Sequence, residues 1–279
     1  MTPGSADPRL AAGVNGNSGQ DSVGSNHKTP ESLLITGASS GIGEALARAY
    51  AAPGAHLFLT GRDETRLGAV AERCRTNGAE VTTAVVDVTD RQAMADWTAE
   101  IESRRPLELV IANAGISAGT GDGEESETQA RQIFAVNLDG VVNTVMPAVG
   151  FMRSRGHGQI AIMSSLAGFR GFPGAPAYCA SKAAARVWGE SLRGHLASSG
   201  ITVSVICPGF VKSRMTAVNP FPMPFLMDTE DAARIIRRGL ARGRARITFP
   251  WPLAAIIWLL NALPPGLTDG ALRRLPEKT

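Results

Sequence analysis

The sequence contains few cysteines and histidines, and their positions argue against several kinds of site. Its 3 cysteines are far apart and lack the spacing of metal ligands: Cys74, Cys179 and Cys207. We expect them to be buried or inert thiols in a reducing compartment. The 4 histidines have no carboxylate or cysteine partner at ligand spacing: His27, His56, His157 and His195. We therefore expect no metal site and no histidine-based catalytic triad.

The sequence also lacks an excess of charge and a long apolar run. Its 28 basic and 25 acidic residues give a formal net charge of +3, which is too balanced for a protein that binds nucleic acid. It has neither a charged-then-apolar N-terminus nor an apolar run of about 20 residues, so secretion and a membrane-spanning helix lack support. The expected location is the cytoplasm.

Three segments differ in composition. Residues 1–30 have too few apolar groups to offset the entropy of ordering, which predicts a disordered tail. Residues 31–250 alternate short apolar runs with amphipathic stretches, as expected of one domain with a parallel sheet covered by helices. Residues 251–279 form an extension that starts with the apolar stretch Trp251–Leu263 and then becomes basic.

Within the central segment, strand and helix patterns alternate. Strands are predicted at 32–36, 55–60, 80–86, 107–112, 158–164, 201–207 and 244–249. Helices are predicted at 42–52, 63–76, 90–103, 126–154, 176–198 and 229–241. The alternation implies right-handed crossovers and an α/β fold of the Rossmann type, with a doubly wound, seven-stranded parallel sheet and helices on both faces.

A glycine-rich turn joins the first strand to the first helix, and it reads Thr36-Gly37-Ala38-Ser39-Ser40-Gly41-Ile42-Gly43. Residues without a side chain reach unusual backbone angles and let a diphosphate approach the amides at a helix N-terminus. Because the turn lies between a strand and a helix, a phosphate-binding role is favoured over a loop without a ligand.

The pattern Thr-Gly-x-x-x-Gly-x-Gly resembles the fingerprint of the short-chain dehydrogenase/reductase family, and the similarity extends over about residues 32–249. Three residues separate Gly37 from Gly41, as in the single-domain members. The resemblance implies an NAD(P)-binding catalytic domain that transfers a hydride between nicotinamide and a carbonyl or alcohol. It makes the turn residues cofactor contacts: Gly37, Ser39, Ser40, Gly41, Ile42 and Gly43.

The end of the second predicted strand bears on the choice of cofactor. Family members that prefer NAD resemble one another in carrying an acidic residue where this sequence has Gly61. Arg62 offers instead a planar, permanently charged group that suits a 2′-phosphate. A basic residue in the glycine turn, found in some NADP-preferring relatives, is absent because Ser40 stands there. We expect NADP(H) to be preferred, with NAD(H) as the alternative.

Three further segments resemble cofactor-binding parts of the family. Asp87 and Val88 follow the third strand, where relatives use the carboxylate to fix the adenine; a helix cap is the other interpretation of Asp87. Asn113, Ala114 and Gly115 resemble the family's Asn-Asn-Ala-Gly, which steadies the sheet beside the cofactor, although Ala112 replaces the first Asn. The third segment resembles the one that pairs with the nicotinamide carboxamide, with Ser213 where Thr is usual: Pro208, Gly209, Val211 and Ser213.

The catalytic candidates are a tyrosine and a lysine four residues apart, Tyr178 and Lys182, which places them on one face of a helix. A neighbouring positive charge stabilises a phenolate, so Tyr178 can exchange a proton near neutral pH. Ser165 ends the fifth strand and can converge with them at the carboxyl edge of the sheet. It resembles the family serine that hydrogen-bonds the substrate oxygen.

Asn137 resembles the family asparagine that bends a long helix and holds a water in a proton relay to the lysine. The resemblance also implies that Lys182 binds the nicotinamide ribose. A homodimer or homotetramer is expected, because family members commonly form these.

Substrate identity is not encoded as clearly. Residues 214–228 lie in the family's variable substrate-covering region and offer an adaptable apolar wall: Phe221, Met223, Phe225, Leu226 and Met227. An apolar ketone, acyl chain or ring system fits better than a sugar.

The apolar stretch Trp251–Leu263 is too short to span a bilayer, so we expect it to be buried elsewhere. Three places are open: the substrate pocket, a second subunit, or the surface of an anionic membrane. In the last case basic residues could meet the lipid headgroups: Arg242, Arg244, Arg246, Arg273 and Arg274.

Overall fold

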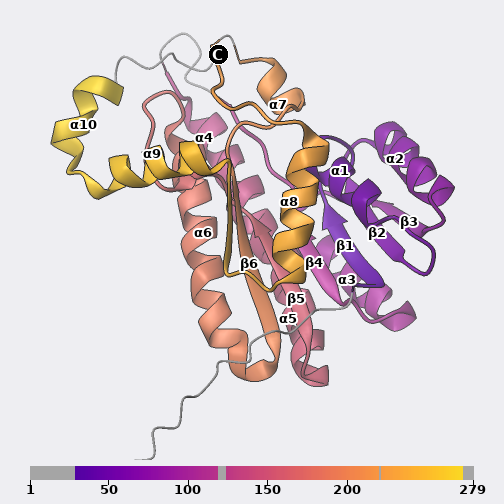
Figure 1. Ribbon diagram of the computed structural model, residues 1–279. Coiled ribbons are helices and arrows are strands. Elements are labelled where there is room, and N and C mark those ends of the chain that lie inside the picture. Colours follow the sequence, from indigo (N-terminus) through magenta and orange to yellow (C-terminus); the bar gives the residue numbers. More distant parts are fainter. Residues whose placement is uncertain (1–28, 119–123, 220, 273–279) are drawn as a thin grey trace, which may run out of the picture.

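Seven parallel strands form one sheet through the middle of the molecule (Figure 1). The computed structural model describes residues 29–118, 124–219 and 221–272, so most of the predicted tail lies outside the described residues. The strands are β1 (Ser32–Thr36), β2 (His56–Gly61), β3 (Glu80–Val85), β4 (Leu109–Ala112), β5 (Gly158–Met163), β6 (Ile201–Pro208) and β7 (Arg246–Phe249). Their order is β3-β2-β1-β4-β5-β6-β7, which confirms the predicted doubly wound sheet.

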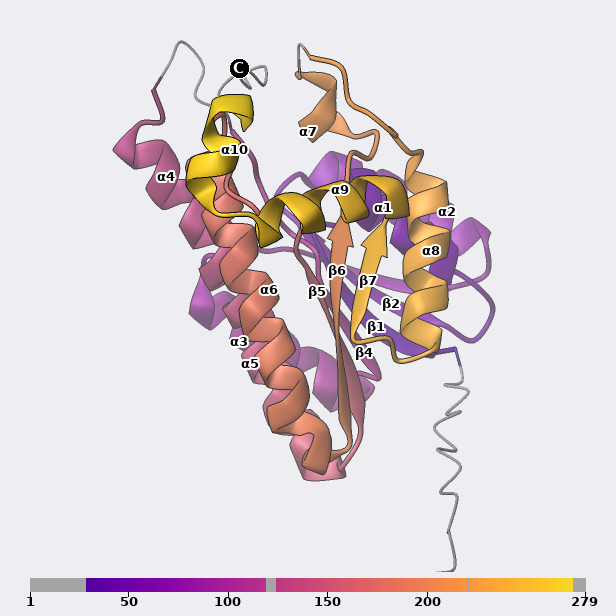
Figure 2. The same ribbon diagram turned by 60° about the vertical axis from the view of Figure 1, so that its left-hand side comes forward.

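Helices cover both faces of this sheet (Figures 1 and 2). One face carries α1 (Gly41–Tyr50), α2 (Glu64–Thr76) and α8 (Thr229–Ala241). The other carries α3 (Arg91–Arg104), α5 (Gly140–Arg155) and α6 (Pro176–Leu196), and α4 (Glu127–Phe134) precedes α5. Asp63 and Asp90 start α2 and α3 by accepting hydrogen bonds from the backbone N–H groups of Arg66 and Ala93.

The two faces form separate cores because neighbouring strand residues point to opposite sides of the sheet. Leu33, Ile35 and Leu57 pack under α1, α2 and α8, whereas Leu34 and Phe58 pack under α3, α5 and α6. All five are fully buried. Strands buried on both faces explain the near-continuous apolar runs in the sequence.

The helix predicted over 126–154 is interrupted. Residues Ala135–Asp139 form a π-helical segment between α4 and α5, and it contains Asn137. The stretch Glu127–Arg155 is long and apolar enough to cross a membrane by length and composition, but half of its most apolar part is buried inside the fold. Its apolar residues serve the core, since Val141, Val145 and Met152 pack against the sheet.

The C-terminal extension contains two helices, α9 (Trp251–Ala262) and α10 (Pro265–Leu272). Figure 2 shows α9 crossing the carboxyl edge of the sheet, directly after β7. The turn before β7, with Arg242 and Arg244, lies at the opposite end of that strand (Figure 1). The expectation that Arg242, Arg244 and Arg246 accompany the apolar stretch is therefore wrong; Arg246 instead pairs with Glu190 on α6.

Candidate active site

A cavity of about 640 Å³ opens along the carboxyl edge of the sheet. Its walls come from the turns that follow β1 to β6, as expected where parallel strands end. It contains the predicted site residues except two: Gly43 and Asn137 lie behind its surface.

The glycine turn follows β1, and its shape depends on missing side chains. Gly37 has a φ of +66°, and a Cβ there would lie 2.7 Å from the Cα of Ala114. A Cβ on Gly43 would lie 2.3 Å from the carbonyl oxygen of Gly37. The side-chain amide of Asn113 donates hydrogen bonds to the carbonyls of Thr36 and Gly37, at 3.0 and 3.2 Å. The turn is thus a tight backbone cradle at the N-terminus of α1, which fits a diphosphate.

The end of β2 offers a cation but no carboxylate. Gly61 is buried, and a Cβ there would lie 3.2 Å from Oγ of Ser39, so a side chain fits only if Ser39 shifts slightly. The Arg62 side chain is 57% exposed at the cavity, and its guanidinium lies 3.8 Å from the Asp87 carboxylate. An exposed ion pair of this length contributes little, so the guanidinium can turn to a phosphate at small cost.

Asp87 does not cap α3, because Asp90 does. The Asp87 carboxylate accepts hydrogen bonds from the backbone N–H and the hydroxyl of Thr89, at 2.9 and 2.8 Å. These bonds and Arg62 lower the pKa of Asp87 against the opposing effect of its burial, the largest single influence. Val88 lines the cavity beside it and packs against Gly140.

Ser165 and Tyr178 meet at the wall of the cavity. Ser165 directly precedes the short 3-10 helix Leu166–Gly168, where its Oγ accepts a hydrogen bond from the backbone N–H of Ala167 at 3.1 Å. Its side chain also hydrogen-bonds that of Tyr178 in the first turn of α6. The neighbouring Ser164 takes a different role, because its Oγ donates to the carbonyl of Lys182 at 2.7 Å.

Lys182 is buried one turn further along α6. Its Nζ donates to the carbonyl of Met163 at 3.1 Å and lies 5.9 Å from the centre of the Tyr178 ring. Burial lowers the pKa of Lys182 to about 8. A buried amine with this pKa is a feature of functional sites more often than of structural ones.

The pKa of Tyr178 departs from the expectation drawn from the sequence. Burial raises it, and the hydrogen bond with Ser165 counters the rise only in part. The expected lowering by Lys182 is therefore not seen, because burial is the largest influence on this pKa and the group that lowers it is Ser165.

Asn137 connects three segments behind the cavity. Its Oδ1 accepts from the backbone N–H of Ile116 at 2.8 Å, and its Nδ2 donates to the Ile116 carbonyl at 2.9 Å and to Ser181 Oγ at 3.1 Å. A Cβ on Gly115 would lie 3.1 Å from Asn137 Oδ1 and 3.2 Å from Lys182 Nζ. Asn137 and Lys182 therefore flank Gly115 from two helices.

The segment after β6 closes the cavity. The carbonyl of Pro208 lies 3.4 Å from the Ser165 hydroxyl, and Gly209 donates its N–H to the carbonyl of Phe249 at 2.8 Å. Ser213 starts the short helix α7 (Arg214–Ala217) by a reciprocal pair of bonds with Thr216. A Cβ on Gly41 would lie 3.3 Å from Cβ of Ser213, so Ser213 lies against the phosphate turn.

Glu125 was not foreseen from the sequence, and the substrate pocket was only one of three expected burial sites for Trp251–Leu263, with no lining residues identified. The carboxylate of Glu125 accepts from the backbone N–H of Ala177 at 3.0 and 3.2 Å and thereby caps α6 directly before Tyr178. Four residues of α9 line the cavity: Leu253, Ile256, Ile257 and Leu260. Their spacing of three, one and three residues signals a helix face, but the apolar residues around them conceal it.

The family model of the short chain dehydrogenases matches residues 31–220. The chain belongs to the short-chain dehydrogenase/reductase family. It is 40% identical over 243 residues to an uncharacterized oxidoreductase of Myxococcus xanthus, covering 87% of this chain and 96% of the relative. It is 34% identical over 186 residues to a 3-oxoacyl-(acyl-carrier-protein) reductase of Rickettsia bellii, covering 67% of this chain and 75% of the relative.

Solved structures of other short-chain dehydrogenases share the fold. A short-chain dehydrogenase from Sphingobium yanoikuyae in complex with NADPH superposes with a TM-score of 0.74 at 25% identity, covering 89% of this chain and 97% of that one. A short-chain type dehydrogenase/reductase from Mycobacterium marinum has the same fold, with a TM-score of 0.71 at 24% identity over 78% and 93%. The chain is an oxidoreductase of this family, and NAD(P) is the family's general cofactor.

Proposed function

We propose that this chain interconverts a carbonyl and a secondary alcohol on an apolar substrate, with NADP(H) as its preferred cofactor. The observation that carries the proposal is the convergence of Ser165, Tyr178 and Lys182 in one cavity, with Ser165 hydrogen-bonded to Tyr178. When bound, the nicotinamide supplies the hydride. The chain supplies the proton and the orientation of the substrate oxygen.

Tyr178 acts as the general acid in the direction of reduction. Because burial raises the pKa of its phenol, Tyr178 is protonated at neutral pH and can donate to an oxygen as negative charge develops on it. Ser165 Oγ stabilises the same oxygen with a hydrogen bond. Lys182 provides a positive charge in the same helix, which limits the cost of leaving a phenolate behind.

NADP(H) preference is supported by Arg62 and by the lack of a carboxylate at Gly61. A carboxylate at that position would repel the 2′-phosphate, whereas a guanidinium can bind it with two parallel hydrogen bonds. A structural neighbour is known in complex with NADPH, which supports the proposal that this fold holds the phosphorylated cofactor.

Transfer of deuterium tests the reaction itself. The chain is incubated with a panel of apolar ketones and NADPH deuterated at C4, and the alcohols are examined by mass spectrometry. The proposal requires an alcohol with one deuterium on the carbinol carbon. If NADPH binds but no ketone is reduced and no alcohol oxidised, the alternative of a catalytically silent NADP(H)-binding scaffold or interaction protein is correct.

A further inference from the structure

Helix α9 contributes one continuous apolar wall to the cavity. Its lining residues are Leu253, Ile256, Ile257 and Leu260, spaced so that they share a single helix face. No charged residue occurs between Arg246 and Asp269, so neither α9 nor its flanks place a charge on this wall.

The wall begins close to the reacting groups. A Cβ on Gly209 would lie 3.0 Å from Cδ2 of Leu253, so the first lining residue packs against the loop that follows β6. Gly209 directly follows Pro208, the last residue of β6, whose carbonyl lies 3.4 Å from the Ser165 hydroxyl. From Leu253 to Leu260 the helix rises by about 10 Å, at about 1.5 Å per residue. The apolar surface therefore starts beside Gly209 and extends along the helix for this length.

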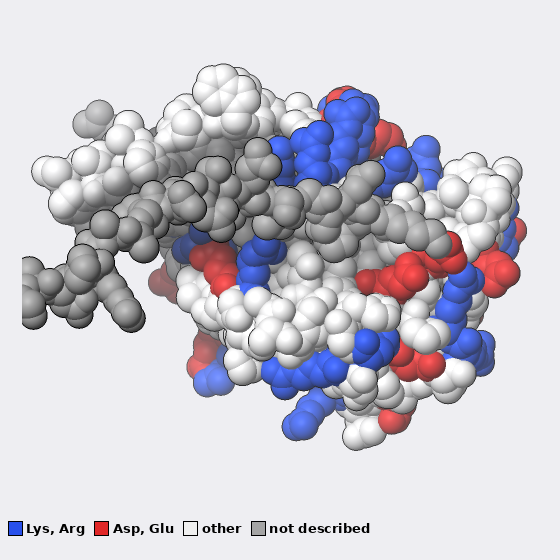
Figure 3. All heavy atoms as spheres, turned by 60° about the horizontal axis from the view of Figure 1, so that its bottom comes forward, with Lys and Arg blue, Asp and Glu red and all other residues white. Residues whose placement is uncertain are grey.

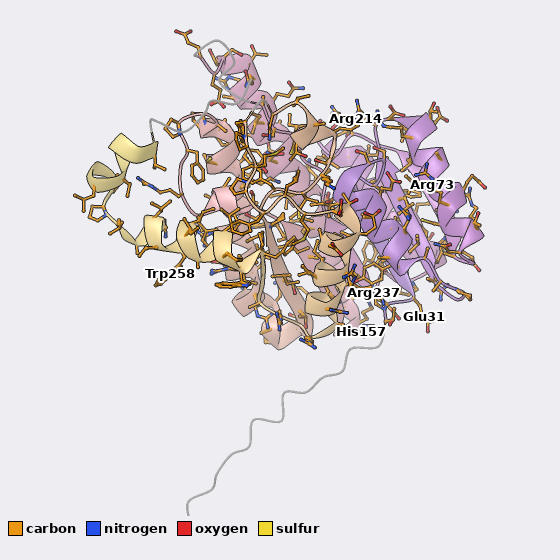
Figure 4. All side chains as sticks on the ribbon, turned by 45° about the horizontal axis from the view of Figure 1, so that its top comes forward. Glu31, Arg73, His157, Arg214, Arg237 and Trp258 are labelled. Atoms are coloured by element: carbon orange, nitrogen blue, oxygen red, sulfur yellow. The ribbon has the colours of Figure 1, made fainter. Side chains whose placement is uncertain are left out.

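Charge is confined to other parts of the cavity. Apart from the buried Lys182, the charged lining residues lie at the ends of β2 and β3, in the first turn of α2 and in α7: Arg62, Asp63, Arg66, Asp87 and Arg214. Facing α9, the segment after α7 adds apolar groups, among them Phe221 and Pro222. Figure 4 shows Arg214 and Trp258 on opposite sides of this edge of the molecule. The cavity thus has a charged end, which suits the cofactor, and an uncharged end, which suits the substrate.

One margin of the wall, midway along its length, is open to solvent. Ile256 lines the cavity and is nevertheless 52% exposed, so the lining continues to the outer surface. A chain longer than the enclosed part can therefore extend past α9, whereas a branched or polar group would lose contacts along it.

We propose that α9 selects substrates with an unbranched apolar chain, which lies along Leu253, Ile257 and Leu260 while its carbonyl is held at Ser165 and Tyr178. This inference rests on the proposed function. It identifies the substrate class as linear alkyl or acyl carbonyl compounds. Each methylene that reaches the wall adds binding, by about 4-fold in affinity, until the chain leaves the helix.

The experiment uses a matched pair of neighbouring leucines. Leu260 lines the cavity, whereas Leu259 is 58% exposed on the outer face. Leu260→Ser and Leu259→Ser make the same chemical change on the two faces of one helix. Ile256→Ser serves as a second inner-face variant, because a half-exposed residue can be replaced without unfolding the chain.

Two measurements are made on each protein. The first is the affinity for unreactive linear amides from butanamide to decanamide, determined by calorimetry in the presence of NADPH. The second is kcat/KM for 2-alkanones of the same lengths. We expect both to rise with chain length in the parent and in Leu259→Ser. In Leu260→Ser and Ile256→Ser the values for the longest chains should fall at least about 10-fold, with short chains unchanged.

The outcomes separate this inference from the proposed function. Length-dependent amide binding that Leu260→Ser abolishes, without ketone reduction, would support α9 as a chain-binding wall and refute the reaction. Ketone reduction that is independent of length, or equal losses in Leu259→Ser and Leu260→Ser, would overturn the role of α9.

Discussion

The ammonium of Lys182 is buried beside Tyr178, and its cost to the folded state depends on pH. The pKa of Lys182 falls from 10.5 to about 8 on folding. Between these values the unfolded chain binds more protons than the folded chain, so this group makes the free energy of unfolding increase as the pH rises. Below about pH 8 the buried charge is a constant penalty.

We therefore predict that Lys182→Met removes a pH-dependent penalty. The free energy of unfolding of the variant minus that of the parent should decrease between pH 7 and pH 10.5 by about 3 kcal/mol, at about 1.36 kcal/mol per pKa unit. Denaturant melts at a series of pH values measure it. Lys212→Met is the control, since Lys212 is exposed and paired with Asp228, and its difference should stay level from pH 7 to 10. A level difference for Lys182→Met would show that its ammonium is not destabilised by burial.

Arg62 carries the prediction on cofactor choice. Arg62→Ile should lower kcat/KM for NADPH roughly tenfold or more, the loss expected for a hydrogen bond to a charged group, and leave that for NADH nearly unchanged. Adding Gly61→Asp should shift the preference further toward NADH, since a carboxylate accepts from the ribose and repels the 2′-phosphate. Because a Cβ at Gly61 would lie 3.2 Å from Ser39 Oγ, that serine must move in the double variant. A parent enzyme that prefers NADH would refute the role of Arg62.

Among the elements, the glycine turn offers a test of the phosphate cradle. Gly43→Ala would place a Cβ 2.3 Å from the Gly37 carbonyl oxygen, so the turn must open. We expect loss of NADPH binding in calorimetry and a stability loss of about 1–3 kcal/mol.

Gly68→Ala is the matched control, because it lies inside α2 with no atom within 4 Å of the added Cβ. It should bind NADPH normally and gain up to about 1 kcal/mol in helix stability. Unimpaired NADPH binding by Gly43→Ala would contradict the claim that this turn binds the diphosphate.

At this scale the sequence predicts most of the fold, and each omission has a physical cause. The seven strands are found within two residues of their expected bounds, since strands buried on both faces leave continuous apolar runs. The π-helical segment at Ala135–Asp139 is missed because its apolar pattern continues that of α4 and α5. The face of α9 in the cavity is missed because a helix apolar on every side does not reveal which side is buried.

Some residues of the candidate site can likewise be predicted from the sequence, and others cannot. Motif residues such as Gly37, Gly41 and Tyr178 can be recognised when their spacing is combined with their position between strands and helices and with the family resemblance. Glu125 cannot, since its contact with Ala177 joins residues 52 positions apart. The pKa of Tyr178 was also beyond the sequence, because burial is a property of the whole fold.

Across the whole molecule, α9 is a projection whose described residues carry no charge (Figure 3). Trp251 and Trp258 are 78% and 65% exposed there, and Figure 4 shows Trp258 pointing away from the cavity. Tryptophan suits the boundary of a bilayer, so we retain the proposal of a peripheral membrane contact. Arg242, Arg244 and Arg246 do not lie beside this face, and Arg273 and Arg274 lie outside the described residues.

We predict that the chain sediments with lipid vesicles and that Trp251→Ser combined with Trp258→Ser remains in the supernatant. Because the face itself has no charge, binding should persist when anionic lipid is replaced by neutral lipid. A chain that ends at Pro250 is a poorer comparison, since it also loses the cavity wall. Recovery of the parent in the supernatant would contradict the membrane contact. So would dimers or tetramers that form through this face, because a second subunit would then cover it.

The central claim is that Tyr178 transfers the proton, and Tyr178→Phe tests it most directly. The change removes the hydroxyl and leaves the ring to pack, so kcat on a ketone accepted by the parent should fall by at least ~100-fold, while the affinity for NADPH and the melting temperature stay close to those of the parent. A variant that keeps most of its turnover would contradict the assignment of Tyr178 and the mechanism built on it.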